Sequence, residues 1–366
     1  MNKIDLRNLT REYSSIKNEL EKEILSVSRS ANYILGEKLE KFEQNFAKFC
    51  GVKYAIGVGS GTAALQLSLN ALNIGKGDEV ITTSMSFCAT AEAIALVGAI
   101  PVFVDVNEDT LSINPEKIKS AITSKTKAII PVHLYGVPAD LHQLIKICKQ
   151  NKLYMIEDCA QAHGCFYENK HVGTFGEFGC FSFMSAKNLG GMGDSGCIIT
   201  NNKKYAEKIK KLRNHGRNTK YRHIVLGSSE RMDTIQAAIL NIKLKYLIGW
   251  NKKRKNLAKI YNQMLDRNKI TTLPNSVINN CVYYVYPIFI KNRNRLKKML
   301  EKNNIATGLY YPIPLHLQPV FNYLGYKKGS FPIAEKMAKR VLAIPMNSFL
   351  SKVEVSKIIN IINTHV

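Results

Sequence analysis

The sequence lacks the long apolar segments and paired cysteines that mark several classes of protein. No apolar run approaches the roughly 18 to 20 residues of a membrane span, and the charged start, MNKIDLRNLTREY, has no apolar signal core behind it. Eight cysteines are scattered without a CxxC pair, which indicates neither a zinc site nor a secreted disulfide framework. We therefore expect no bound metal, no membrane association and a reducing, cytoplasmic location.

Acidic residues are also scarce, with 28 against 52 basic residues and a net charge of +24. An excess of this size is typical of proteins that bind nucleic acids. The basic stretches 203–222 and 252–254 lie on helix-like segments with apolar residues at helical spacing, which indicates solvated helix faces. No basic motif interleaved with aromatic residues and no finger spacing accompanies them. We expect no nucleic-acid partner, although a positive field would help to collect an anionic substrate.

The chain is long enough to bury a large core, with 366 residues of which 45% are hydrophobic. Strand-like runs alternate with helical patterns, which predicts an α/β fold with a mainly parallel sheet covered by helices on both faces. We expect a large domain, 1–250, that includes N-terminal helices, and a small α+β domain, 251–366. The expected strands are 53–58, 79–83, 100–106, 127–132, 153–156, 179–184 and 282–290, and the expected helices are 13–27, 37–50, 63–72, 88–97, 115–122, 141–149, 251–265, 295–302 and 353–362.

Lys187 follows one of these strand-like runs and precedes the glycine cluster at 190–193. An ordinary lysine is a solvated cation on a helix face. Here the preceding Phe181, Phe183 and Ala186 suit a buried site, and the glycines let the backbone pass close to a ligand. A buried lysine loses proton affinity and becomes a nucleophilic amine. This favours bonding to a carbonyl compound or to pyridoxal phosphate.

Pyridoxal phosphate needs a carboxylate at its ring nitrogen, N–H groups around its phosphate and a flat apolar partner for its ring. Asp158 directly follows a strand, where it would meet the ring nitrogen, and Gln161 would reach the ring hydroxyl. The turn 59–62 joins a strand to a helix and suits a phosphate, while Phe87 lies at another strand end. Taken singly, these features also suit capping by Asp158, turn chemistry at 59–62 and core packing of Phe87.

Together these segments resemble the DegT/DnrJ/EryC1/StrS family of nucleotide-sugar aminotransferases, and the resemblance runs over essentially the whole chain. The segments that carry it are GSGTAAL at 59–65, SFCATA at 86–91, EDCAQAHG at 157–164, FSF at 181–183, KNLG at 187–190, RMDTIQAA at 231–238 and YPIPLH at 311–316. The resemblance implies a fold-type-I enzyme with a seven-stranded sheet in its large domain. It also implies a homodimer whose active sites lie between the subunits.

The resemblance further implies roles for individual residues. Lys187 matches the lysine that bonds pyridoxal 5′-phosphate, where the family's dehydratase members carry histidine, and this favours transamination over deoxygenation. Asp158 and Gln161 match the partners of the ring nitrogen and ring hydroxyl. The remaining matches are Gly61, Thr62 and Ser182 for the phosphate, Phe87 for the ring face, and Arg231, Tyr311 and His316 for the substrate. The prolines after Tyr311 exclude a helix, so we expect an extended loop there; a lone histidine such as His316 is otherwise usually structural.

One position departs from the family's pattern. The family commonly carries an asparagine two residues before the position of Arg231, and that asparagine reaches the phosphate bound in the neighbouring subunit. This chain has Ser229 there, a shorter side chain with a single hydroxyl donor. We expect a cross-subunit contact that is weaker, water-mediated or absent. Arg231 would serve the anionic substrate or, alternatively, form a structural ion pair with Asp233 or another acid.

The resemblance predicts transfer of an amino group from L-glutamate to a keto group of a nucleotide-linked sugar, in the biosynthesis of lipopolysaccharide, another cell-surface polysaccharide or a related aminosugar. Members that act at C3 resemble KNLGGMGDSG at 187–196 and the loop 311–316, whereas members that act at C4 carry a TTGEGG-like run. Asp194 is shorter than glutamate and Met192 is bulkier than glycine, so the loop should present a different floor to the sugar. We expect a 3-keto sugar. The alternatives are a 4-keto-sugar aminotransferase, an inactive nucleotide-sugar-binding or regulatory protein, and, more remotely, a nucleic-acid binder.

Overall fold

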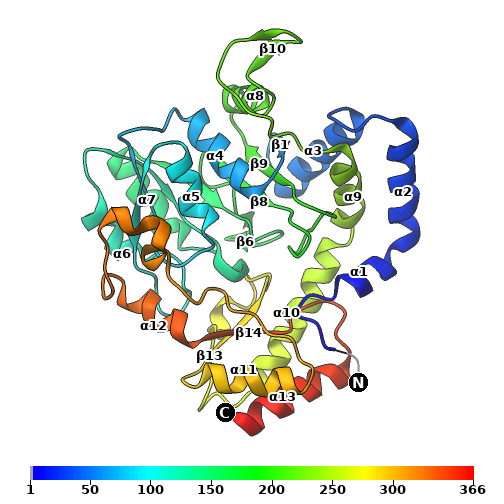
Figure 1. The fold of residues 1–366 in the computed structure, drawn as a ribbon, viewed down its shortest axis with the longest axis vertical. Coiled ribbons are helices and arrows are strands. Elements are labelled where there is room, and N and C mark those ends of the chain that lie inside the picture. Colours follow the sequence, from blue (N-terminus) through cyan, green and yellow to red (C-terminus); the bar gives the residue numbers. More distant parts are fainter. Residues whose placement is uncertain (1–2) are drawn as a thin grey trace.

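A seven-stranded sheet forms the centre of the computed structural model, which describes residues 3–366 (Figure 1). The strand order is β1-β9-β8-β5-β4-β2-β3, and β9 alone runs antiparallel to its neighbours. This confirms the predicted α/β fold with a mainly parallel sheet. The strands are β1 Tyr54–Val58, β2 Glu79–Thr83, β3 Ile100–Val104, β4 Thr126–Ile130, β5 Tyr154–Asp158, β8 Phe178–Ser182 and β9 Gly196–Thr200.

Helices cover both faces of the sheet. On one face, Val80 and Ile198 pack with apolar side chains of α4 (Gly61–Ala71), α5 (Ala89–Leu96) and α8 (Lys203–Leu212). On the other face, Ile81 and Ile199 pack with α3 (Glu37–Cys50), α7 (Leu141–Asn151) and α9 (Thr234–Leu244). Because successive strand residues point to opposite faces, a sheet buried on both sides requires near-continuous apolar strands, which these are.

The C-terminal part builds on a second, antiparallel sheet of β12 (Thr271–Thr272), β13 (Tyr286–Phe289) and β14 (Val341–Ile344). Its helices are α10 (Leu247–Met264), α11 (Arg293–Lys302), α12 (Pro332–Arg340) and α13 (Lys352–His365). The predicted division after residue 250 falls inside α10. Ile4 also pairs with Ile305 and packs in the C-terminal core, although the prediction assigned it to the large domain. A two-domain division therefore remains a proposal.

Several element boundaries differ from the predictions. The helix predicted at 13–27 is two helices, α1 (Leu9–Ser15) and α2 (Lys17–Ser30), because the buried Ile16 between them has non-helical backbone angles (φ −134°, ψ 19°). The helix predicted at 115–122 is α6 (Pro115–Ile118) followed by a short 3-10 helix. In each case a tertiary contact or local turn ends a pattern that looks continuous in the sequence.

The strand predicted at 282–290 begins only at Tyr286. The N–H groups of Val282 and Tyr284 instead donate to the carbonyls of Gly136 and Tyr135, which follow β4. This segment is therefore bonded to the large domain and not to the C-terminal sheet. The basic run 203–222 is helical only as far as Leu212. Beyond it, β10 (Arg217–Thr219) and β11 (Arg222–His223) form a hairpin that projects from the body (Figure 1).

Two expectations concern cysteines and membranes. All eight cysteines are free thiols, and seven of them are buried. Within residues 3–366, no helix has both the length and the apolar content needed to cross a bilayer.

Candidate active site

A cavity of about 240 Å³ lies at the carboxyl ends of the parallel strands, the place where open α/β sheets bind ligands. Residues that follow β1, β2, β4 and β8 line it, together with the last residue of β5. The cavity brings together seven of the residues predicted from the sequence, namely Gly61, Thr62, Phe87, Asp158, Gln161, Ser182 and Lys187.

One end of the cavity is formed by the N-terminus of α4. Ser60 caps this helix, its Oγ accepting a hydrogen bond from the N–H of Ala63 (3.0 Å). The first N–H groups of a helix have no acceptor within the helix, and the helix dipole adds partial positive charge there. A Cβ on Gly61 would stand 2.6 Å from the Cβ of Ser182, so only glycine lets α4 approach the end of β8 this closely. The arrangement suits a phosphate.

Asp158 ends β5 and is buried, with 5% of its surface exposed. One carboxylate oxygen accepts a hydrogen bond from Thr90 Oγ1 (2.8 Å) and the other from the N–H of Ala160 (3.1 Å). Burial raises the pKa of Asp158, while Thr90, Ala160, Lys187 and His133 partly offset this. No ion pair involves this carboxylate in the described part of the chain. A ring N–H⁺ at the cavity would supply the cation that this site lacks.

Lys187 lies on the loop after β8 and lines the cavity. Desolvation by burial lowers the pKa of its amine, although Tyr284 and Asp158 raise it. The adjacent Asn188 is held firmly, since its Nδ2 donates to Val282 O (2.9 Å) and Asn251 Oδ1 (3.0 Å). The lysine is therefore anchored by C-terminal segments and kept closer to the unprotonated form that a nucleophile or base requires.

Gln161 and Phe87 line the cavity, and both contact Tyr311 of the C-terminal part. Gln161 Oε1 accepts from the N–H of Tyr135 (2.7 Å), and its Nε2 donates to the Tyr311 hydroxyl (3.1 Å). The ring of Phe87, which is 57% exposed, lies 5.9 Å from the Tyr311 ring between centroids. An exposed aromatic face at a cavity suits stacking on a flat ligand. Tyr311, predicted to contact substrate, is thus placed beside residues predicted to contact the cofactor.

Four predicted residues are not among those that line this cavity in the single chain: Tyr311, which contacts two lining residues, and His316, Ser229 and Arg231. His316 is buried, with its Nε2 3.0 Å from Glu335 Oε1 and its ring against Phe331. A side chain enclosed in this way favours a structural role, and the substrate contact of His316 stays a prediction.

Ser229 is exposed and pairs with Asn214 through the backbone. Arg231 Nη1 donates to Asn214 Oδ1 (3.1 Å), and no ion pair of Arg231 with Asp233 or another acid occurs within residues 3–366. Both residues lie at the base of the projecting hairpin, outside the cavity of their own chain.

Sequence reasoning missed three neighbours of the site. Thr90 orients Asp158 and lies within the SFCATA segment, so its motif was visible although its partner was not. Tyr284, from the C-terminal part, contacts the amine of Lys187, and Arg7, from the N-terminal segment, contacts the Tyr284 ring. The sequence around Tyr284 and Arg7 does not predict these contacts. They depend on the hydrogen bonds of segment 282–285 to Tyr135 and Gly136, and on the pairing of Ile4 with Ile305.

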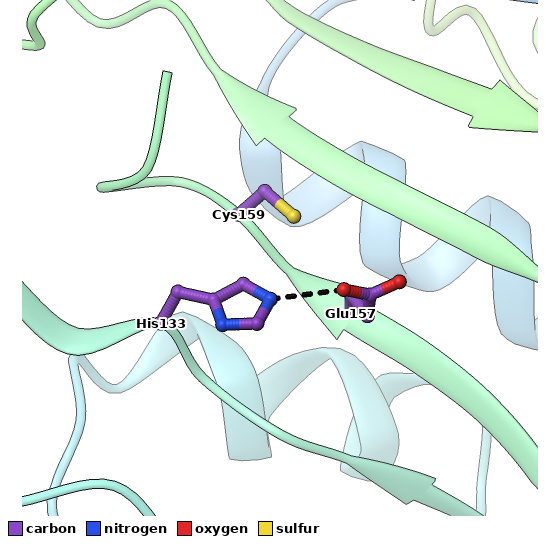
Figure 2. A group of neighbouring side chains, drawn as sticks. All are labelled: His133, Glu157 and Cys159. Carbon is purple, nitrogen blue, oxygen red and sulfur yellow. Dashed lines mark hydrogen bonds and ion pairs between the residues drawn. The ribbon is translucent and has the colours of Figure 1, made fainter. Parts of the chain in front are cut away.

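His133, Glu157 and Cys159 also lie close together, at the ends of β4 and β5 (Figure 2). Their ligand atoms are within 4.8 Å of one another, a spacing that would suit a metal ion. However, Glu157 already accepts hydrogen bonds from His133 Nε2 and from three backbone N–H groups of the loop 173–176. His133 Nδ1 accepts from the N–H of Ala139 (3.1 Å). The lone pairs that a metal would need are in use, so the group ties the loop before β8 to β5.

The cavity residues fit pyridoxal phosphate. The N-terminus of α4 with Gly61, the buried carboxylate of Asp158 without a paired cation, and the amine of Lys187 with its lowered pKa all line the same cavity. An exposed aromatic ring completes the set. This donor set supplies each of the partners that the cofactor's phosphate, ring nitrogen, aldehyde and ring face require.

Comparison with known proteins places these features in context. The model of the DegT/DnrJ/EryC1/StrS aminotransferase family matches residues 14–363. A protein of Geobacillus stearothermophilus named pleiotropic regulatory protein is 44% identical over 94% of this chain and 93% of its own length. The dTDP-3-amino-3,4,6-trideoxy-alpha-D-glucose transaminase of Streptomyces venezuelae is 38% identical over 95% of this chain and 92% of its own.

Solved structures agree with this family match. DesV of Streptomyces venezuelae superimposes with a TM-score of 0.97 and 36% identity, covering 100% of this chain and 98% of its own. NtdA of Bacillus subtilis, solved with bound cofactor PMP, gives a TM-score of 0.92 at 30% identity, covering 99% of this chain and 85% of its own. The fold and the cofactor predicted from the sequence are confirmed.

Proposed function

Because the chain belongs to the DegT/DnrJ/EryC1/StrS aminotransferase family, whose members are sugar aminotransferases that use pyridoxal 5′-phosphate, we propose that it moves an amino group from L-glutamate to C3 of a 3-keto nucleotide sugar. The observation that carries this proposal is the convergence of Lys187, Asp158 and the N-terminus of α4 on one cavity. A biosynthetic role in cell-surface polysaccharides or related aminosugars would follow from such a product.

The bound cofactor supplies an aldehyde carbon that bonds amines and a ring that withdraws electrons from that carbon. Gly61, Thr62 and Ser182 would hold its phosphate. Asp158 would keep the proton on the ring nitrogen, because this restores a cation beside a buried carboxylate. Phe87 would cover one face of the ring and exclude water there.

Lys187 would act as the base and acid of the reaction. Its amine would remove the proton from the α-carbon of glutamate and later deliver a proton to C3 of the sugar. Burial favours the unprotonated amine that the first of these steps needs. Gln161, fixed between Tyr135 and Tyr311, would orient the ring hydroxyl.

The choice of C3 over C4 rests on the loop after Lys187 and on relatives. Asp194 lines the cavity, and the neighbouring Met192 is 42% exposed, so both side chains are available to shape a sugar site. Gln236 holds this loop by accepting from the N–H of Met192 (2.8 Å) and donating to its carbonyl (3.2 Å). The Streptomyces venezuelae relative is named for a 3-amino sugar, which supports the same carbon here.

A regulatory protein without catalysis is the second candidate, because a relative that is 44% identical carries the name of a pleiotropic regulator. The complete set of Lys187, Asp158 and the α4 turn favours catalysis, since binding alone would not need a lysine of lowered pKa.

The deciding assay offers the pyridoxamine-loaded protein a 3-keto and a 4-keto nucleotide sugar in parallel. We expect the pyridoxal absorbance to return faster with the 3-keto sugar and to fail with the Lys187→Ala variant. Faster return with the 4-keto sugar would contradict the choice of carbon. No return with any member of a broad ketosugar panel would favour the regulatory alternative.

A further inference from the structure

Tyr284 contacts two cations, one of which is the active-site Lys187. The Nζ of Lys187 is 4.5 Å from the centroid of its ring, and the guanidinium carbon of Arg7 is 3.9 Å from the same centroid. Tyr284 is buried, with 3% of its surface exposed. Its backbone is fixed by the hydrogen bond from its N–H to Tyr135 O (2.9 Å). The ring therefore has a defined place, and the lysine amine meets an aromatic surface there.

Arg7 reaches Tyr284 from the N-terminal segment. Ile4 holds this segment by pairing with the chain at 304–306, donating to Asn304 O and accepting from the N–H of Ala306. Arg7 Nη1 then donates to the carbonyl of Tyr284. Its Nε and Nη2 are buried without a hydrogen-bond partner, and in residues 3–366 no acid forms an ion pair with it. The guanidinium thus contacts the ring and backbone carbonyl of Tyr284 and the side chain of Tyr310, rather than a carboxylate of the described residues.

We propose that the Lys187 amine rests against the ring face of Tyr284 whenever that amine is not bonded to the cofactor. In the same proposal, Arg7 holds the Tyr284 ring in place. The inference rests on the proposed function, in which Lys187 is displaced by glutamate and must stay near the reacting carbon. The negative face of an aromatic ring attracts an ammonium group, most strongly where water is excluded. Tyr284 is then a further catalytic residue, because it touches the group that carries the proton.

The electrostatics of the cluster agree with this role. Burial lowers the pKa of Lys187, Tyr284 and Asp158 raise it, and Arg7 lowers it. His163, a titratable neighbour of Lys187, is held neutral because burial, and then Lys187, lower its pKa to about 3. Tyr310, Tyr311 and Arg254 are the further titratable neighbours of Tyr284. Burial raises the pKa of the Tyr284 phenol, but the cations of Lys187 and Arg7 outweigh this and lower it overall. The phenol of Tyr284, through its charge and its hydrogen bond to Lys187, thus offsets part of the desolvation of the amine, in addition to the contact that the ring face makes.

The test measures how fast the cofactor-free full-length protein captures pyridoxal phosphate at different pH values, followed by the visible absorbance of the bound cofactor. Capture needs the unprotonated amine, so the rate rises with pH through the pKa of Lys187. Removing the ring in Tyr284→Leu takes away support for the ammonium form. We expect the midpoint to move to lower pH by about 1 unit. Tyr284→Phe keeps the ring face, and we expect less than half of that shift.

Tyr326→Leu is the control. It also removes a tyrosine ring, but that ring packs on Phe103 (5.6 Å between centroids) and Phe331 (5.2 Å) rather than on Lys187, Tyr284 or Arg7, so its midpoint should equal that of the wild type. Ionisation of pyridoxal phosphate itself is common to all variants and cancels. Should Tyr284→Leu not fold by circular dichroism, Tyr284→Met removes the ring in the same way. An unchanged midpoint in the folded ring-less variant would overturn the inference alone, whereas absence of absorbance in the wild type would overturn the proposed function.

Discussion

At the scale of single residues, the site depends on a carboxylate and an amine that the fold keeps apart from water. Asp158 is buried between Thr90 and the backbone of Ala160, with no cation paired to it in the described residues. Such a carboxylate destabilises the cofactor-free protein, because the folded state disfavours its charge. The cofactor's ring nitrogen would remove that penalty. Burial of Asp158 thus lowers the stability of the cofactor-free protein and favours binding of the cofactor.

Asp158→Asn separates these two effects. Because the pKa of Asp158 is raised in the folded state, the stability that protonation contributes is present at low pH and lost as the pH rises through the folded pKa. We expect the cofactor-free variant to resist urea at least as well as the wild type at pH 7, with the difference vanishing at acid pH. Amino transfer should fall on the order of 100-fold or more, because the ring proton is no longer held. A variant that is less stable at pH 7 yet fully active would contradict this account.

The sequence predicted residues whose position at the site is set by the strand that they follow. It did not predict residues whose position depends on contacts with a distant segment. Asp158 and Lys187 were predictable because each follows an apolar strand. Tyr284 was not, since it lies in a run that looks like the start of β13 but instead bonds Tyr135 and Gly136. His316 is the opposite case, because its motif predicts a substrate contact, which stays a prediction, while its side chain pairs with Glu335.

At the scale of elements, the site is made by the approach of α4 to the end of β8. The first helical residue, Gly61, stands directly over Ser182, and the space between them excludes any side chain on residue 61. The alternation of strands and helices predicted this turn. It did not predict β9, because a glycine loop rather than a helix joins β8 to it and the strand therefore runs antiparallel.

Gly61→Ala tests the closeness of this approach. A Cβ there would meet Ser182 at 2.6 Å, so α4 or β8 must shift and the phosphate N–H groups move with them. We expect affinity for pyridoxal phosphate to fall at least 10-fold, about 1.4 kcal/mol, as measured by titration of visible absorbance. Gly249→Ala is the matched control, because a Cβ there meets nothing within 4 Å and should leave the affinity unchanged. Equal affinities for the two variants would refute the phosphate cradle.

At the scale of the whole molecule, Ser229 and Arg231 lie outside the cavity of their own chain, at the base of the projecting hairpin. The hairpin and the loop that follows it carry several exposed apolar side chains, Tyr221 (82%), Ile224 (45%), Val225 (39%) and Leu226 (97%), and exposed apolar patches often mark protein–protein contacts. We propose that two chains pair and that these residues complete the partner's site. The net charge of +24 would then surround two sites that collect anionic substrates.

Mixing two inactive variants tests shared sites. Lys187→Ala disables the site of its own chain, and Arg231→Ala would disable the partner's. If the chains exchange, half of the dimers are mixed and each has one complete site, so we expect about a quarter of the wild-type activity to return. Lys187→Ala mixed with Asp158→Asn, two changes in the same cavity, should return none. Sites confined to single chains would give no recovery in either mixture.

The central claim is that Lys187 bonds the cofactor and that glutamate displaces it. The most direct measurement is the absorbance spectrum of purified protein given pyridoxal 5′-phosphate, recorded before and after addition of glutamate, with Lys187→Ala alongside. We expect a visible band in the wild type that fades as glutamate is consumed and 2-oxoglutarate forms, and no such response in the variant. A wild-type spectrum without the band, or a Lys187→Ala protein that still forms 2-oxoglutarate at the wild-type rate, would contradict the account.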